Sequence, residues 1–121
     1  MTTDEKFMKQ ALKEAEKALK KDEVPIGAVI VKNGKVISRA HNIIRLKHDP
    51  AGHAEILAIK KAAAKLSNER LNGADLYVNI EPCFMCGGAI LHSRIKRIVF
   101  GARSPEAGAF GGVVELNNTP I

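Results

Sequence analysis

Hydrophobic and polar residues alternate along the chain with two periods, which predict helices and strands in turn. Residues 2–21 carry an apolar stripe at helical spacing, and Thr2 and Glu5 have the spacing of an N-terminal capping box. This pattern predicts an amphipathic helix with its lysines in solvent. The stripe consists of Phe7, Met8, Ala11, Leu12, Ala15, Ala18 and Leu19.

A β-hairpin should follow this helix. Apolar runs predict strands at 26–32 and 36–41, and Asn33-Gly34 between them is the strongest short-range hairpin signal that a sequence offers. An irregular stretch over 42–52 comes next, and a second helix is predicted from His53 to Leu66. The first half of the chain therefore predicts the order helix, strand, strand, helix.

The second half alternates strand and helix. Asn72-Gly73 marks a turn before a strand over 76–80, and Pro82 then opens a short helix to about His92, because proline fits the first helical turn. An almost continuous apolar run predicts a last strand over 95–100. The tail beyond it is rich in glycine, and the one element we assign there is a short helix near 113–116.

This order of elements predicts an α/β protein. Strands joined by helical crossovers pair in parallel with right-handed connections, whereas a hairpin pairs antiparallel. We therefore expect a three-layer α/β/α fold, with helices on both faces of a central mixed sheet. A chain of 121 residues favours one domain over 1–121, because two domains would each be too small to bury a core.

The composition of the chain limits the cellular compartment and the class of binding partner that we expect. The chain is 45% hydrophobic and 26% charged, and it has no apolar run near the roughly 20 residues of a membrane span. Residues 1–9 are polar and charged, unlike a secretory signal, so we expect a cytoplasmic protein. The formal net charge of +6 favours a polyanionic partner such as nucleic acid, although scattered basic residues also suit an ordinary solvated surface.

His53, Cys83 and Cys86 are the residues whose chemistry suits a metal ion. Imidazole nitrogen and thiolate sulfur are preferred zinc ligands, and a lone Cys-x-x-Cys in a cytoplasmic chain indicates metal binding or redox chemistry. Both cysteines fall in the first turn of a predicted helix, whose positive end lowers a thiol pKa. His53 begins another helix, so two helix starts should converge on one ion at the carboxyl ends of neighbouring strands.

Three protein ligands leave one zinc position for water, which is the arrangement of catalytic zinc. Glu55 follows His53 by two residues and is placed to serve as general acid and base. Positions i and i+2 do not share a helical face, so this assignment requires His53 to stand at the very first helical position. His-x-Glu followed by Pro-Cys-x-x-Cys is the signature of zinc-dependent nucleobase deaminases.

Two other interpretations fit parts of this pattern. Redox proteins and zinc ribbons also carry Cys-x-x-Cys, but neither explains His-x-Glu. A non-catalytic zinc or RNA-binding module requires a closed site, with His41, His48 or His92 as the fourth ligand. Replacing Glu55 by alanine separates the interpretations, since a deaminase loses turnover whereas a structural module loses nothing measurable.

The residues around these motifs carry a family resemblance. His53-Ala54-Glu55 and residues 81–86 resemble the cytidine deaminase superfamily. The resemblance covers essentially the whole chain, and it implies a cytidine deaminase-like fold with one zinc ion per subunit. It further implies hydrolytic conversion of adenosine to inosine at wobble position 34 of a tRNA, with Glu55 transferring the protons. Further segments narrow the resemblance to the bacterial tRNA-specific adenosine deaminases: residues 24–31, 48–50, 76–78, 87–95 and 99–103.

The same resemblance implies roles around the substrate. Asn42 would hydrogen-bond the base, Ala54 would contribute backbone contacts beside the metal, and the pocket would be walled by Val24, Pro25 and Ile26. Members of the family are homodimers that receive a splayed anticodon loop, in agreement with the recognition of single-stranded RNA through extruded bases.

Aromatic side chains that could stack on such bases are few. They make up only 4% of the chain, and the candidates are Phe84 and Phe110. Core packing is the alternative for both residues, since phenylalanine is more often buried than exposed.

The chain departs from the family at two places. Family members carry an acidic residue near the ribose after Arg103, whereas this chain has Ser104, which predicts weaker discrimination of RNA from DNA. Relatives continue past the position of Ile121 into a further strand and a C-terminal helix, so we expect a C-terminally shortened fold. The 95–100 strand should then be an exposed edge, unless a partner subunit covers it.

An alternative enzyme is a deaminase of a free base or nucleoside, such as guanine, cytosine or adenine. Its zinc chemistry would be identical, and a compact chain without an RNA-gripping terminus fits it. The flanking motifs and the positive charge favour the tRNA anticodon loop, or another single-stranded nucleic acid.

Overall fold

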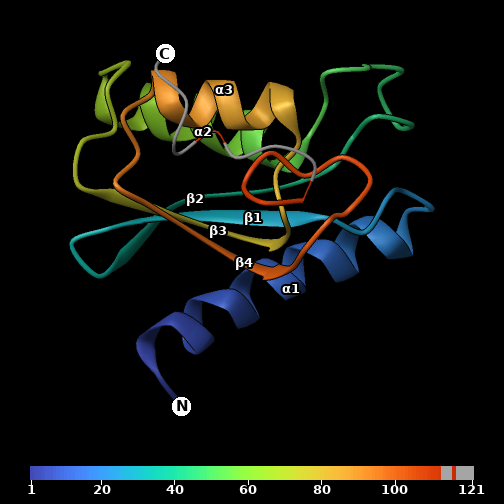
Figure 1. Cartoon of the computed structure of the whole chain (residues 1–121), viewed down its shortest axis with the longest axis horizontal. Helices are drawn as coiled ribbons and strands as arrows, with labels where there is room; N and C mark the ends of the chain where they lie inside the picture. The colour runs from blue at the N-terminus through green and yellow to red at the C-terminus, as the bar shows by residue number, and fades with distance from the viewer. Residues whose placement is uncertain (113–115, 117–121) are drawn as a thin grey trace.

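The computed structural model describes residues 1–112 and 116, and its elements follow the predicted order (Figure 1). The predicted capping box is present, because the Thr2 hydroxyl accepts the Glu5 N–H at 3.1 Å and the Glu5 carboxylate accepts the Thr2 N–H at 3.2 Å. The elements are α1 (Thr3–Lys20), β1 (Gly27–Lys32), β2 (Lys35–His41), α2 (Ala54–Leu66), β3 (Ala74–Ile80), α3 (Phe84–His92) and β4 (Arg97–Ala102).

No predicted bound of these elements is off by more than two residues, and β3 begins at Ala74 and β4 ends at Ala102, each two residues beyond its predicted bound. The helix predicted from Pro82 begins two residues later, because Cys83 has an extended backbone (φ −78°, ψ −179°) and stands at the N-cap. The strand predicted from Ile95 begins at Arg97, because Arg94 has a left-handed φ of 63° and prolongs the turn. The short helix predicted near 113–116 lies outside the described residues, apart from Leu116.

The four strands form one mixed sheet in the order β2-β1-β3-β4. β1 pairs antiparallel with β2 and with β3, and β3 pairs in parallel with β4, which confirms the prediction of a mixed sheet. The expectation that α2 and α3 follow neighbouring strands was wrong, because β1 lies between β2 and β3. Both strands nevertheless run opposite to β1, so their carboxyl ends lie at the same edge of the sheet.

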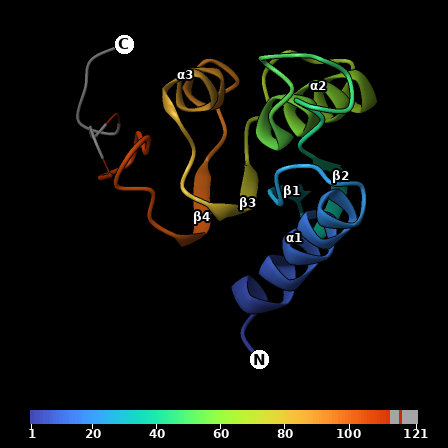
Figure 2. The same cartoon turned by 90° about the vertical axis from the view of Figure 1, so that its right-hand side faces the viewer.

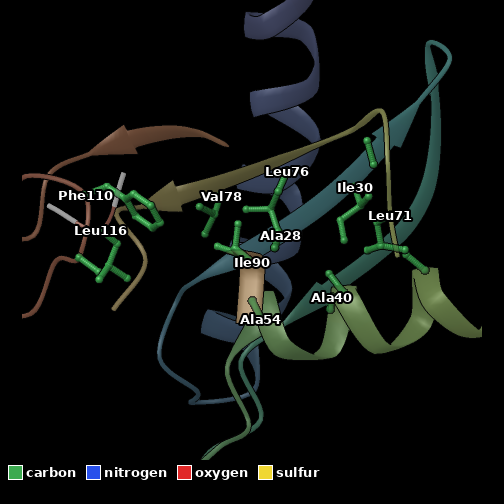
Figure 3. Close-up of a cluster of buried hydrophobic side chains, with 14 residues drawn as sticks. Ala28, Ile30, Ala40, Ala54, Leu71, Leu76, Val78, Ile90, Phe110 and Leu116 are labelled. Carbon is green, nitrogen blue, oxygen red and sulfur yellow. The ribbon is translucent and has the colours of Figure 1, made fainter. Parts of the chain in front are cut away.

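Helices cover both faces of this sheet, as predicted: α1 lies on one face, and α2 and α3 lie on the other (Figures 1 and 2). β1 is buried from both sides, with Ala28 and Ile30 in the core under α2 and α3, and Val29 and Val31 in the core under α1. In Figure 3 the first pair lies in one cluster with Ile90 of α3. In the described part of the chain, no helix is long and apolar enough to cross a membrane.

The segment after β4 returns to the core. β4 is an edge of the described sheet, in agreement with the expectation from the sequence. Phe110 is 4% exposed and joins Leu116 in the core cluster of Figure 3. Core packing, the alternative to stacking for Phe110, is therefore confirmed, because the return of the chain buries its ring. Phe84 at the start of α3 is 56% exposed, so its ring remains a candidate surface for stacking on a base.

Asp4 ties the N-terminal end of α1 to the sheet. Its carboxylate accepts hydrogen bonds from Arg97 Nη2 and from the Tyr77 hydroxyl, each at 2.6 Å. These hydrogen bonds, from Arg97 first and Tyr77 second, hold the pKa of Asp4 below its ordinary value of 3.8. Arg97 also lies 3.3 Å from Asp75, so a single guanidinium joins the helix to two strands.

Candidate active site

Two helix starts meet at the edge where β2 and β3 end. His53 stands at the N-cap of α2 and Cys83 at the N-cap of α3, and Cys86 lies in the first turn of α3. The ligand atoms of these three residues all lie within 4.8 Å of one another. The shared direction of β2 and β3 therefore brings together residues that are 30 positions apart in the sequence.

The donor set and its spacing fit zinc. Zn–S bonds of about 2.3 Å and Zn–N bonds of about 2.0–2.1 Å at tetrahedral angles separate nitrogen from sulfur by about 3.6 Å. His53 Nδ1 lies 3.6 Å from Cys83 Sγ and 3.4 Å from Cys86 Sγ. One ion could thus be held through Nδ1 and both sulfurs with little adjustment, and three protein ligands leave a fourth position free.

The two thiols differ in how readily they ionise. The hydrogen bond with Cys86 lowers the pKa of Cys83 to about 5, whereas the same hydrogen bond and burial raise the pKa of Cys86. The contact between the two sulfurs therefore favours loss of one proton from the pair. A cation bound beside it favours loss of the second proton, because metals coordinate the thiolate form of cysteine.

Glu55 places a carboxyl group beside these ligands. It is the second residue of α2 and 4% exposed, and its Oε1 atom has no hydrogen-bond partner among the described residues. Burial raises the pKa of Glu55 to about 7. The expectation that His53 is the first helical residue was off by one position, because His53 is the N-cap and precedes the helix. Its backbone is extended (φ −79°, ψ 146°), so the directions of the His53 and Glu55 side chains are not set by helical spacing.

Asn42 joins the end of β2 to the start of α2. Its side chain is 1% exposed, and its Oδ1 atom accepts the Ala54 N–H at 2.7 Å, which satisfies a free donor at the helix start. Its own N–H donates to the Ile26 carbonyl at 3.0 Å. Because Oδ1 is engaged by the helix, Nδ2 is the atom of Asn42 that remains for a substrate. Sequence analysis did not identify this structural role.

Val24, Pro25 and Ile26 form the loop that leads into β1. Val24 and Ile26 are half-buried, and Pro25 is exposed. The side chain of Asn79, at the end of β3, accepts the Gly27 N–H at 2.9 Å and donates to the Pro25 carbonyl at 3.0 Å. This loop is therefore fixed from the neighbouring strand by a residue that sequence analysis did not identify.

Glu23 fixes the same loop from the other side. Its buried carboxylate accepts the N–H groups of Val24 at 2.9 Å, Arg45 at 2.8 Å and Leu46 at 3.0 Å. Burial opposes ionisation, but these backbone hydrogen bonds outweigh it and lower the pKa of Glu23. The carboxylate thus connects the loop before β1 to the long loop between β2 and α2.

The remaining histidines lie apart from the group that could hold a metal ion. His41 lies with its Nε2 atom 3.2 Å from Lys21 Nζ, and His48 and His92 are exposed on a loop and at the end of α3. Within residues 1–112 and 116, the potential metal-binding group contains none of the three. The closed four-ligand site required by the non-catalytic module is therefore not formed by these side chains.

Ser104, the residue expected near a ribose, is held next to the loop that carries Cys83. Its N–H donates to Glu81 Oε1 at 3.1 Å. Burial opposes ionisation of Glu81, but backbone hydrogen bonds from Ser104, Gly112 and Phe110 outweigh it and lower the pKa of Glu81. In the sequence Glu81 is only the residue before the Pro-Cys-x-x-Cys motif, and nothing there indicates these hydrogen-bond partners.

Solved structures identify the class of enzyme that shares this fold. A guanine deaminase from Bacillus subtilis superposes with a TM-score of 0.79 at 39% identity, covering 82% of this chain and 64% of that chain. A structure from a study of A-to-I editing by tRNA:A34 deaminases at the wobble position of transfer RNA superposes with a TM-score of 0.91 at 49% identity, covering 94% of this chain and 83% of that chain. The fold is that of the cytidine deaminase-like enzymes, as predicted.

Sequence comparison identifies the family within this class. The model of the MafB19-like deaminase family matches residues 2–118, and the chain belongs to this family. The tRNA-specific adenosine deaminase of Bacillus subtilis (strain 168) is 51% identical over 116 residues, which are 96% of this chain and 72% of the relative. The protein of the same name from Aquifex aeolicus (strain VF5) is 48% identical over 114 residues, 94% of this chain and 74% of the relative.

Proposed function

We propose that this protein hydrolyses adenosine to inosine at wobble position 34 of a tRNA, with one zinc ion per subunit held by His53, Cys83 and Cys86. The observation that carries the proposal is this three-ligand group with the buried carboxyl group of Glu55 beside it. The choice of adenosine in tRNA is supported by the relatives that share half of the sequence, which are named tRNA-specific adenosine deaminases.

The reaction replaces the exocyclic amine at C6 of adenine by the oxygen of water and releases ammonia. When bound, zinc in a three-ligand site supplies activation of water at neutral pH. Glu55 accepts the proton that the attacking water loses and delivers it to the ring nitrogen next to C6. It then accepts the second proton, from the new hydroxyl group on C6, and delivers it to the amine, which leaves as ammonia while the C6 carbonyl forms. The Oε1 atom has no hydrogen-bond partner in the described part of the chain, which supports this assignment because a proton carrier needs an oxygen that no protein donor occupies.

Recognition of the base involves the residues around the end of β2. The Nδ2 group of Asn42 donates to the base, since Oδ1 of the same side chain is engaged by Ala54. Val24, Pro25 and Ile26 wall the pocket, and the backbone of Ala54 lines it beside the metal. Support for a preformed wall comes from Glu23 and Asn79, whose hydrogen bonds fix this loop.

The macromolecular substrate calls for an open, basic surface. The formal net charge of +6 favours an RNA partner, and the exposed ring of Phe84 offers a base a surface for stacking. We propose that the protein receives the splayed anticodon loop as a homodimer, and that it works in the cytoplasm, where tRNA is used.

Incubation with a tRNA anticodon stem-loop containing adenosine at position 34 tests the proposal. Inosine is scored by nucleoside analysis after digestion, and a stem-loop with guanosine at position 34 serves as the substrate control. Glu55→Ala should keep its zinc content and lose turnover, because the ligands remain while the proton carrier is removed. A zinc-loaded protein that leaves the stem-loop unchanged would refute the proposal.

A second candidate function is deamination of free guanine. It is favoured by the similarity to the guanine deaminase of Bacillus subtilis, at a TM-score of 0.79 and 39% identity. Comparing kcat/KM for free guanine, cytosine, adenosine and the stem-loop separates the candidates. A preference for guanine over the stem-loop would replace the proposed substrate while leaving the zinc chemistry intact.

A further inference from the structure

Glu81 is a buried carboxylate with an unusual set of partners. It follows β3 and directly precedes Pro82 and Cys83, and it is 4% exposed. Its Oε2 atom accepts the N–H groups of Phe110 and Gly112, each at 2.8 Å, and its Oε1 atom accepts that of Ser104 at 3.1 Å. All three donors belong to the backbone of the segment that follows β4, so the carboxylate joins two parts of the chain.

The segment that follows β4, residues 104–112, is also bonded to the loop of Cys83 itself. The Ala109 N–H donates to the Pro82 carbonyl at 2.9 Å, and Cys83 and Gly108 form an isolated β-bridge. The Glu81 N–H donates to the Ala102 carbonyl at 2.8 Å. The backbone on both sides of the ligand Cys83 is thus held from residues 102–112.

Glycines make room for the carboxylate. A Cβ atom at position 108 would lie 2.1 Å from Glu81 Oε2, and one at position 112 would lie 3.0 Å from the same oxygen. Gly108 has an ordinary backbone conformation, so its lack of a side chain is explained by this close approach rather than by its φ angle. Gly108 and Gly112 therefore lie directly against the Glu81 carboxylate, where a side chain at position 108 would collide with it.

We infer that Glu81 is a positioning residue of the metal centre: it binds residues 104–112 to the loop of Cys83 and thereby fixes the sulfur of Cys83 relative to His53. The inference rests on the proposed function only in taking His53, Cys83 and Cys86 as the zinc ligands. The same hydrogen bonds place Ser104 relative to the metal, so one carboxylate sets the positions of a ligand and of a residue predicted at the substrate.

Glutamine is the sharpest substitution at this position, because it keeps the size of the side chain while it removes the charge and one of the two acceptor oxygens. An amide has a single acceptor oxygen, so its NH2 group must face at least one of the three N–H donors. Glu81→Gln should therefore loosen residues 104–112 without opening a cavity. Glu23→Gln is the matched control, because Glu23 is also buried and also accepts three backbone N–H groups. None of these donors is next to a ligand in the sequence, since Leu46 precedes His53 by seven residues.

The test measures metal binding to the full-length chain, with no RNA present. Cobalt(II) is titrated into metal-free protein and followed by its thiolate charge-transfer and ligand-field absorption, and zinc affinity is measured by competition with a chromophoric chelator. Glu81→Gln should weaken both affinities by about tenfold, the lower end of the effect of outer-shell changes, and should shift the cobalt spectrum. Glu23→Gln should keep the wild-type affinity and spectrum, while losing thermal stability to a similar extent.

Wild-type affinity and spectrum in Glu81→Gln would overturn the inference, and so would an equal loss in both variants, since that marks a general effect of destabilisation. If Glu81→Gln does not fold, Gly108→Ala serves as the second test, because its methyl group would collide with the Glu81 carboxylate and displace it. Unchanged cobalt affinity in Gly108→Ala would also overturn the inference. Failure of the proposed function would look different. Glu81→Gln would then still weaken metal binding, but the zinc-loaded wild-type protein would convert no adenosine.

Discussion

Asn42 has a structural role in the fold and a proposed role in substrate recognition, and two substitutions at this position separate them. Asn42→Ala removes the acceptor of the Ala54 N–H, a 2.7 Å hydrogen bond in a buried environment. A buried donor left without a partner costs about 1–3 kcal/mol, and a helix start without its side-chain acceptor costs about 1 kcal/mol. We therefore expect the free energy of unfolding to fall by about 2 kcal/mol. For a chain of 121 residues this corresponds to a decrease in Tm of about 6–10 °C.

Asn42→Asp keeps an acceptor for the Ala54 N–H and removes the Nδ2 donor. A carboxylate at a helix start is favoured by the helix dipole, which offsets part of the cost of burying its charge. The aspartate variant should therefore lose less stability than the alanine variant. Its kcat/KM on the stem-loop should nevertheless fall at least about tenfold, the equivalent of about 1.4 kcal/mol for a hydrogen bond to the base.

Thermal unfolding and initial rates of inosine formation, measured on zinc-loaded protein, check both expectations. An alanine variant as stable as the wild type would show that the hydrogen bond to Ala54 contributes nothing. An aspartate variant with wild-type kcat/KM would show that Nδ2 does not contact the base, whatever its stability.

Three further predictions concern the fold and the substrate. Gly27→Ala should lower the free energy of unfolding by about 1–3 kcal/mol, because the added methyl would lie 2.3 Å from the Ala11 carbonyl oxygen; an unchanged urea midpoint would contradict this. Asp4 has a lowered pKa beside Arg97, so this pair stabilises the fold above about pH 4 and its contribution is lost as pH falls through the lowered pKa. The difference in Tm between wild type and Asp4→Asn should therefore shrink from about pH 5 to pH 2, and a constant difference would exclude the pairing as its cause. Ser104 should permit deamination of a DNA hairpin matched to the RNA stem-loop, and undetectable conversion of the DNA would rule this out.

The sequence alone determined the features that depend on residues close together in the chain. The capping box at Thr2 and Glu5 spans three residues, and the turn at Asn33 and Gly34 needs only positive φ at two positions, 53° and 75° in the structure. Helical and strand periods depend in the same way on which neighbouring side chains share a face. The pattern His-x-Glu with Cys-x-x-Cys likewise indicated the metal chemistry, because the required residue types are rare and their spacing is short.

Only the tertiary structure decided which distant groups meet. β1 lies between β2 and β3, although the sequence suggested that the strands before the two helices are neighbours. Hydrophobic burial is not directional, so the apolar pattern of a strand shows that it is buried but not which strand lies beside it. The carboxylate of Glu81 shows the same limit for polar groups: its partners lie up to 31 residues away and are backbone N–H groups, which every residue except proline carries. Their identity was fixed when residues 104–112 folded back onto the loop of Cys83.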